Sequence, residues 1–378
     1  MFDIYLDHNA TTPLREEVSH EVMECMNNNY GNPSSIHGLG QKAKKKLTDS
    51  RETIAEFFNV KPSEIVFTSG GSESNNLALK GFNSVDGKNH IITSKIEHPS
   101  VIETCKYLES IGFSVTYLNV DSCGRVVPDE LESAINNKTF LISLQHANNE
   151  IGTIQNLESI ALIAHKYNLI FHVDAVQSIG KVPLNLRELN IDLLSASAHK
   201  INGPKGVGFL YINERLKKLT PLIHGGPQER KRRAGTINLP SIAGFAKAIC
   251  LLKNSSINHD VLSVRNFFEE TLLHNLSNVT INGDVKSRLH NTSSITFHGV
   301  DNEAVLISLD IKGICASAGS ACSSGSIKHS PVLKAIGLSD EDSSATVRFS
   351  FGYKNSISDA KSVVHELVQI ITHIRSIN

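Results

Sequence analysis

Between residues 50 and about 250, short apolar runs alternate with stretches of helical periodicity. The runs have the length and β-branched content of buried strands, and they lie at residues 64–67, 90–93, 114–118, 140–144, 169–173, 193–195 and 208–212. Helical patterns lie between them, at residues 74–81, 100–111, 128–135, 157–167 and 186–189. Near-continuous apolar strands joined by helices predict an α/β fold, with a mostly parallel sheet covered by helices on both faces.

The pattern changes after Pro240. A long helical stretch is followed by three short strands and a final helix, at residues 241–274, 278–281, 294–297, 346–350 and 358–374. This order is typical of a smaller α+β domain, and 378 residues exceed one ordinary domain. We predict a large domain of residues 15–255 and a small domain formed by residues 1–14 and 256–378.

Composition narrows the functional class. Lys and Arg (37) balance Asp and Glu (38), which gives no indication of a nucleic-acid partner. No apolar run is long enough to span a membrane, and the start of the chain lacks a signal-peptide pattern. The six cysteines form no C-x-x-C pair, which favours reduced thiols over disulfides or structural zinc. We therefore expect a soluble cytoplasmic protein without a metal site.

Several polar segments follow predicted strands, where open parallel sheets bind ligands. Residues 68–76 are small and precede a helix, so they suit either a phosphate loop or a flexible turn with a Ser cap. Residues 145–152 carry amides that suit either ligand binding or capping. Asp174, with Gln177, is either a ligand contact or a helix cap, and Lys200 follows the next strand. Their joint occurrence favours one ligand site.

Lys200 suggests the chemistry of that site. It lies between a run of small residues and a glycine-rich turn, and partial burial there favours a neutral amine. A single lysine is most often a solvated surface residue. Together with the carboxylate of Asp174, however, it indicates a pyridoxal 5'-phosphate (PLP) enzyme, in which a lysine forms a Schiff base and a carboxylate keeps the pyridine nitrogen protonated.

Cys322 is a second candidate for chemistry. Its neighbours are almost all Ser, Ala and Gly, which predicts a mobile polar loop and a reactive thiol. The alternative is a buried structural cysteine, the commoner fate of a free thiol. Cys315, in an apolar run, better fits that alternative.

These motifs and several others, in order along essentially the whole chain, resemble the cysteine desulfurases of the NifS/IscS class. That class belongs to the fold-type I PLP-dependent enzymes and the class-V aminotransferase family. The other motifs lie at residues 5–13, 30–37, 224–230, 233–236, 316–322 and 347–352.

The resemblance implies roles for residues around the cofactor. Lys200 would carry PLP and move protons at carbon, and Asp174 would pair with its pyridine nitrogen. Gln177 would hydrogen-bond the phenolic oxygen of the ring, and His98 would stack on the ring face and relay protons. The phosphate would be bound by Gly71, Ser72, Ser197 and His199.

The resemblance also implies the substrate and the partners. Asn149, beside the cofactor, and Arg348 would orient the carboxylate of L-cysteine, and Thr236 would reach the phosphate of a partner subunit in a homodimer. Cys322 would take the sulfur as a persulfide, leaving L-alanine, and pass it to an acceptor protein such as an iron–sulfur scaffold or a relay for tRNA thiolation. The alternatives are a selenocysteine lyase or aminotransferase of the same fold, and a non-catalytic regulator of sulfur trafficking.

Overall fold

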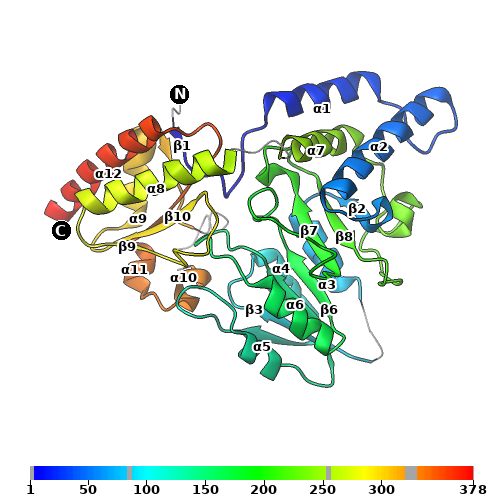
Figure 1. Ribbon diagram of the computed structural model, residues 1–378, viewed down its shortest axis with the longest axis horizontal. Helices are drawn as coiled ribbons and strands as arrows, with labels where there is room; N and C mark the ends of the chain where they lie inside the picture. Colours follow the sequence, from blue (N-terminus) through cyan, green and yellow to red (C-terminus); the bar gives the residue numbers. More distant parts are fainter. Residues whose placement is uncertain (1–3, 83–86, 253–256, 320–329, 378) are drawn as a thin grey trace.

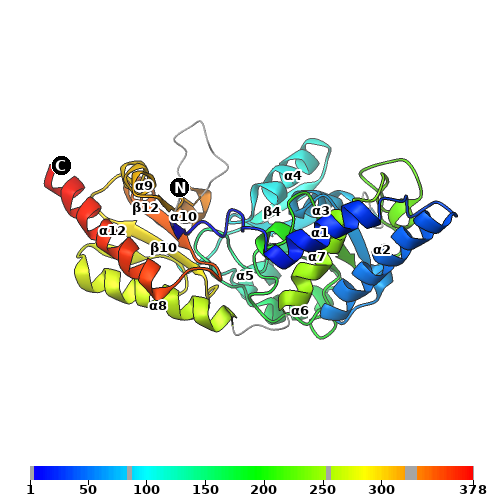
Figure 2. The same ribbon diagram turned by 90° about the horizontal axis from the view of Figure 1, so that it is seen from above.

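The chain folds into two bodies that lie side by side, each with its own sheet (Figure 1). The computed structural model describes residues 4–82, 87–252, 257–319 and 330–377. The N-terminal segment begins in the smaller body and crosses to the larger one, as the view from above shows (Figure 2).

The larger body contains a seven-stranded sheet. In spatial order its strands are β2 (Ile65–Thr68), β8 (Gly208–Ile212), β7 (Leu193–Ser197), β6 (Ile170–Asp174), β5 (Thr139–Gln145), β3 (His90–Ser94) and β4 (Ser114–Leu118). Strand β8 runs antiparallel to both of its neighbours, and the remaining pairs are parallel. The prediction of a mostly parallel sheet is confirmed.

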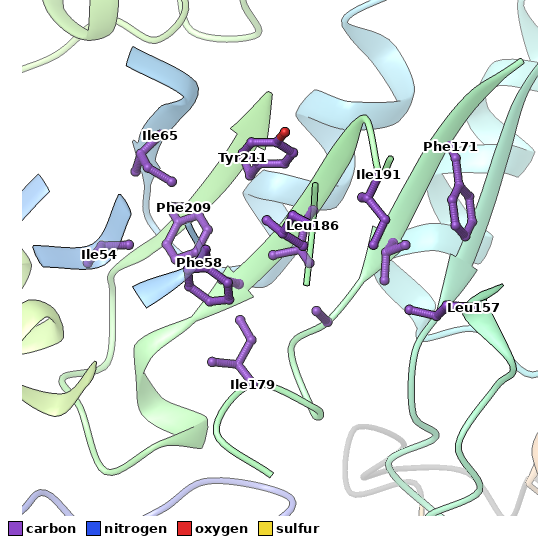
Figure 3. Close-up of a cluster of buried hydrophobic side chains, with 14 of the residues drawn as sticks. Ile54, Phe58, Ile65, Leu157, Phe171, Ile179, Leu186, Ile191, Phe209 and Tyr211 are labelled. Atoms are coloured by element: carbon purple, nitrogen blue, oxygen red, sulfur yellow. The ribbon is translucent and has the colours of Figure 1, made fainter. Parts of the chain in front are cut away.

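Successive residues of the strands pack into hydrophobic clusters on opposite faces of this sheet. In β8, Phe209 and Tyr211 belong to one cluster, whereas Leu210 and Ile212 belong to the other (Figure 3). The first face is covered by α1 (Glu16–Asn28), α2 (Gly38–Phe57), α6 (Leu157–Lys166) and α7 (Leu239–Leu252). The second face is covered by α3 (Gly71–Lys80) and α4 (Pro99–Ser110). Helices therefore cover both faces, as the apolar strands predicted.

The smaller body is built on a three-stranded antiparallel sheet. Its elements are β9 (Val279–Ile281), β10 (Thr292–Phe297), β12 (Thr346–Ser350), α8 (Ile257–Asn275), α9 (Asn302–Ile311) and α12 (Ile357–Ile377). A separate hydrophobic cluster holds it together and includes Leu6 from the N-terminal segment. This cluster supports the division of the chain at residues 15 and 255, which remains a prediction.

Short elements complete the chain. They are β1 (Ile4–Tyr5), which pairs in parallel with β11 (Ile314–Cys315), the helices α5 (Pro128–Ser133), α10 (Pro331–Ala335) and α11 (Asp340–Ser344), and the 3-10 turns η1 (Pro62–Glu64), η2 (Ala198–Lys200) and η3 (Gln228–Lys231). Within the described ranges, no helix has both the length and the apolar character needed to cross a membrane.

One prediction about a helix was wrong. Residues 186–189 form a turn, because the Asn190 N–H bonds back to the Arg187 carbonyl and Asn190 adopts a left-handed backbone conformation (φ 48°). The helical stretch expected over residues 241–274 corresponds to α7 and α8, which flank residues 253–256, outside the described part of the chain.

The core of the smaller body yields a stability prediction. Phe268 is fully buried, and its ring packs against Phe349 and Phe351 at centroid distances of 5.0 and 5.4 Å. Phe268→Ala should lower the free energy of unfolding by about 3–5 kcal/mol, because it leaves a cavity among these rings. Chemical denaturation measures the loss. The matched control is Phe267→Ala, since Phe267 is only partly buried, and equal losses in the two variants would contradict the assignment.

Candidate active site

A cavity of about 580 Å³ lies at the carboxyl ends of the large sheet's parallel strands. Strand β2 ends at the same edge as β7, because both run antiparallel to β8. The cavity also receives residues from the N-terminal segment and from the smaller body. Its lining includes, among the residues predicted from the sequence, Gly71, Ser72, His98, Asn149, Asp174, Gln177, Ser197, His199, Lys200 and Arg348.

Two predicted residues stand apart from this group. Thr236 is exposed and is not among the described residues that line the cavity. Cys322 lies outside the described residues. The roles expected for both remain predictions.

Asp174 ends strand β6 and is 6% exposed. Its Oδ2 accepts a hydrogen bond from Asn75 Nδ2 at 2.7 Å, and its Oδ1 accepts one from the Val176 N–H at 3.0 Å. Both carboxyl oxygens of Asp174 therefore accept a hydrogen bond within the folded chain. Sequence reasoning placed Asn75 in a possible phosphate loop, and nothing in the sequence indicated its contact with Asp174.

Lys200 ends the 3-10 turn η2, directly after strand β7. Its Nζ donates hydrogen bonds to the carbonyl oxygens of Asn9, at 2.5 Å, and Ala10, at 2.8 Å. Gln177 Nε2 donates to the same Asn9 oxygen at 2.9 Å. The N-terminal segment therefore brings together two of the side chains that were expected to contact PLP, Lys200 and Gln177.

His98 caps the N-terminus of α4, where its Nδ1 accepts a hydrogen bond from the Ser100 N–H at 3.1 Å. Burial lowers the pKa of His98, and the charge of Lys200 lowers it further, against an opposing effect of Asp174. Because Nδ1 is the acceptor in this bond, a neutral ring carries its proton on Nε2. A neutral ring on the cavity wall suits stacking against a heterocycle.

The start of α3 forms an anion cradle. A Cβ on Gly71 would lie 2.6 Å from the Val176 side chain (Cγ2), and one on Gly208 would lie 2.7 Å from the Cα of Gly70, so neither position has room for a larger residue. The first N–H groups of a helix attract anions. Ser197 and His199 lie on the same cavity wall, and burial, with Lys200, lowers the pKa of His199 to about 4.

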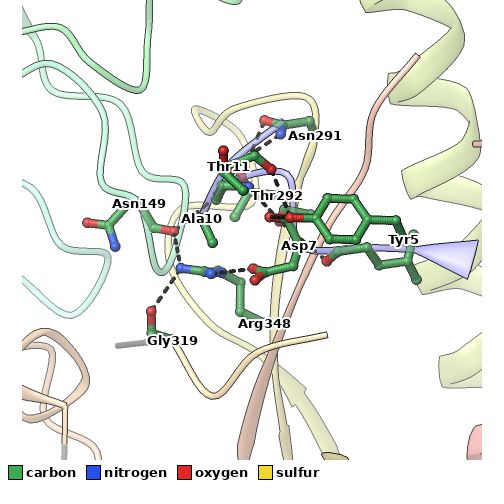
Figure 4. Close-up of polar contacts among 12 residues, drawn as sticks. Tyr5, Asp7, Ala10, Thr11, Asn149, Asn291, Thr292, Gly319 and Arg348 are labelled. Atoms are coloured by element: carbon green, nitrogen blue, oxygen red, sulfur yellow. Dashed lines mark hydrogen bonds and ion pairs between the residues drawn. The ribbon is translucent and has the colours of Figure 1, made fainter. Parts of the chain in front are cut away.

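Arg348 reaches the cavity from strand β12 of the smaller body and is 2% exposed. Its Nη1 donates to the carbonyl oxygens of Asn149 and Gly319 at 3.1 and 2.8 Å, and its Nη2 lies 2.6 Å from Asp7 Oδ1 (Figure 4). The side-chain amide of Asn149 points away from the guanidinium (Figure 4). Arg348 Nε has no partner within the described residues. A buried guanidinium held in this way suits a small carboxylate.

Two buried carboxyl groups on the cavity wall were not predicted. Burial, with a smaller contribution from the negative charge of the nearby Asp174, raises the pKa of Glu97 from its ordinary 4.5 to about 8. Ser94 Oγ donates to Glu97 Oε1 at 2.5 Å, and Oε2 has no hydrogen-bond partner in the described part of the chain. Burial also raises the pKa of Glu150, whose Oε2 accepts from Ser330 Oγ at 2.5 Å. Burial of this degree cannot be inferred from the sequence, so these protonation states could not be predicted.

The wall of the cavity fits PLP group by group. It offers an anion cradle for the phosphate, a hydrogen-bonded carboxylate in Asp174 for the ring nitrogen, and an amine in Lys200 for the aldehyde. The described residues contain no cluster of His, Cys, Asp and Glu that could hold a metal ion.

Comparison with known proteins agrees with this geometry. Residues 4–363 match the model of the aminotransferase class-V family. The chain belongs to this family. The cysteine desulfurase IscS of Dictyoglomus turgidum is 45% identical over 381 residues, which cover 100% of this chain and 96% of that protein.

Solved structures of family members are similar over nearly the whole chain. A NifS-like protein is 37% identical with a TM-score of 0.91, covering 98% of this chain and 99% of that one. A structure of SspA in complex with cysteine is 38% identical with a TM-score of 0.83, covering 93% and 99%. This chain is therefore a fold-type I, PLP-dependent enzyme of the NifS/IscS class.

Glu97 gives a pH prediction. Its pKa in the folded protein, about 8, exceeds the ordinary 4.5, so Glu97 contributes stability below pH 4.5 that is lost as the pH rises to about 8. Glu97→Gln removes this loss, and its stability relative to wild type should therefore grow between pH 4.5 and about 8. Urea unfolding across this range measures the difference. Glu130→Gln, an exposed control, should run parallel to wild type, and a parallel Glu97→Gln curve would contradict the prediction.

Proposed function

We propose that this enzyme removes sulfur from L-cysteine, yields L-alanine, and takes the sulfur first on Cys322 as a persulfide. The observation that carries the proposal is the cavity itself, where Lys200, Asp174 and the buried guanidinium of Arg348 converge. Relatives 45% identical over the full length are named cysteine desulfurases, which supports the choice of reaction.

Arg348 would bind the substrate carboxylate. The guanidinium is already oriented by Asp7 and by the carbonyl of Asn149, so little side-chain freedom is lost when a carboxylate binds. The side-chain amide of Asn149 is directed away from Arg348 and remains available for a second contact (Figure 4). A small amino acid fits this arrangement.

PLP would be held by the cradle at the start of α3, by Asp174 and by Lys200. When bound, it withdraws the electron pair that remains when a proton leaves Cα of an amino acid. Lys200 lines the cavity and would remove and return that proton. The lowered pKa of His98 keeps its imidazole neutral at pH 7 and able to exchange a proton nearby.

The sulfur step balances without an external oxidant or reductant. The Cys322 thiolate attacks the sulfur of the substrate, an S–S bond forms, and the C–S bond breaks with its electron pair kept by carbon. A proton then replaces sulfur on that carbon, and L-alanine leaves. The persulfide passes to a thiol or scaffold acceptor, either for iron–sulfur assembly or for tRNA thiolation.

The homodimer and the compartment belong to the same proposal. Thr236 is exposed and lies outside the wall of its own cavity, which suits a contact with the phosphate of a partner subunit. In the described residues, Cys25, Cys105, Cys123, Cys250 and Cys315 are unpaired thiols, which fits a reducing cytoplasm.

Lys200→Ala tests the covalent attachment of the cofactor. The variant should lose desulfurase activity by roughly a thousandfold or more, because both the attachment and the proton transfer are lost. PLP should still enter the cradle but should leave on dialysis, whereas wild type stays yellow. A variant that retained PLP through dialysis would contradict the role of Lys200.

Cys322→Ser tests the sulfur acceptor. The variant should bind PLP normally but lose alanine production by roughly a thousandfold or more, because an alcohol does not accept the sulfur. Mass spectrometry after L-cysteine treatment should find one added sulfur on Cys322 in wild type. Cys315→Ser is the matched control and should retain activity. Full alanine release by Cys322→Ser would overturn the assignment.

A further inference from the structure

Lys181 is a cation that the proposed reaction leaves without a role. It follows strand β6 by a short turn and lines a second cavity of about 70 Å³, which also borders Lys200. Among the described residues, this cavity is lined by the basic side chains of His8, Arg15 and His290 and by no Asp or Glu. The described lining of this cavity therefore offers Lys181 no carboxylate as a partner.

The hydrogen-bond partner of Lys181 is Gln177. Lys181 Nζ donates a hydrogen bond to Gln177 Oε1 at 3.3 Å. On the other side of the amide, Gln177 Nε2 donates to the Asn9 carbonyl at 2.9 Å. An ammonium or amine can donate only to the oxygen of the amide, and a carbonyl can accept only from its nitrogen. The two contacts therefore select the same orientation of the Gln177 amide.

The orientation matters because Gln177 borders the main cavity. An amide nitrogen has two N–H donors, and the Asn9 carbonyl uses one of them. The second is available to an acceptor on a bound molecule. A reversed amide would present its oxygen instead, and that oxygen would repel an anionic acceptor such as the phenolic oxygen of PLP.

We propose that Lys181 is a positioning residue that fixes the Gln177 amide with its nitrogen toward the cofactor. The inference rests on the proposed function, since the acceptor is the phenolic oxygen of bound PLP. Lys181 does not touch the substrate or the cofactor, and it acts through Gln177.

The electrostatic surroundings agree with this role. Burial, together with the positive charges of Lys200 and Arg348, lowers the pKa of Lys181 to about 7. His8 and His290 face the same space, and burial lowers the pKa of each to about 4, so both rings are neutral at pH 7. A neutral Lys181 amine keeps N–H groups that can donate to Gln177 Oε1, and the Asn9 carbonyl, which can only accept, holds the amide in the same orientation.

A pH titration of the visible absorbance of the PLP-loaded protein tests the inference. An N–H donated to the phenolic oxygen stabilises its negative charge. It therefore lowers the pH midpoint at which the bound chromophore loses its proton. Lys181→Met and Gln177→Leu should each raise the midpoint by about one pH unit, the effect expected for one lost hydrogen bond to a charged group. The double variant should shift no further than Gln177→Leu alone.

Lys205→Met is the matched control, because Lys205 is an exposed lysine near His199 and, within the described part of the chain, has no hydrogen bond to Gln177. It should keep the wild-type midpoint. If Lys181→Met does not fold, as judged by thermal unfolding, Lys181→Leu takes its place in the cycle.

The outcomes separate the two ideas. A wild-type midpoint in Lys181→Met, or a double variant that shifts by the sum of the single shifts, would overturn the role through Gln177 and leave the desulfurase proposal intact. Wild-type protein that takes up PLP without any visible absorbance would overturn the proposed function, and this inference with it.

Discussion

Asn9 is the residue on which the geometry of the site depends. Its Nδ2 donates to the Asn149 carbonyl and to Thr292 Oγ1, at 3.0 and 2.9 Å, and its Oδ1 accepts from Asn291 Nδ2 at 3.0 Å. Its carbonyl accepts from Lys200 and Gln177. Because Asn9 is 1% exposed, few of these bonds can be exchanged for water. One buried residue thus holds together the large sheet, the segment after β5 that carries Asn149, and the smaller body.

Burial then decides which groups at the site carry charge. A carboxyl group such as Glu97 is ionised in water at neutral pH, whereas burial raises its pKa and favours the protonated form here. Burial lowers the pKa of His98 and favours its neutral ring. Asp174 and Arg348 have hydrogen-bond partners suited to an ion. A neutral ring, one carboxylate and one guanidinium are thus held in separate parts of one cavity. This separation lets the cofactor ring and the substrate carboxylate find opposite charges without competing for the same group.

The sequence predicted the parts of this structure that depend on local pattern. Apolar runs located the strands of the large sheet, and residue types at the strand ends indicated Asp174, Gln177 and Lys200, which line the cavity. Contacts between distant segments were beyond such reasoning. Asn9, for example, hydrogen-bonds Thr292, 283 positions away in the chain. Lys181 stands out only because the described residues that line the small cavity include no carboxylate. The turn at 186–189 was missed because left-handed Asn190 overrides a short apolar pattern.

The two bodies contribute different residues to the site. Residues that would hold PLP come from the large sheet, whereas Arg348 comes from β12 of the smaller body. Arg348 also donates to the carbonyl of Gly319. A substrate carboxylate would therefore bind the same guanidinium that donates to the Gly319 carbonyl. Selection of the substrate and the position of residue 319 are accordingly linked through one side chain, while the contacts expected for the cofactor remain on the large sheet.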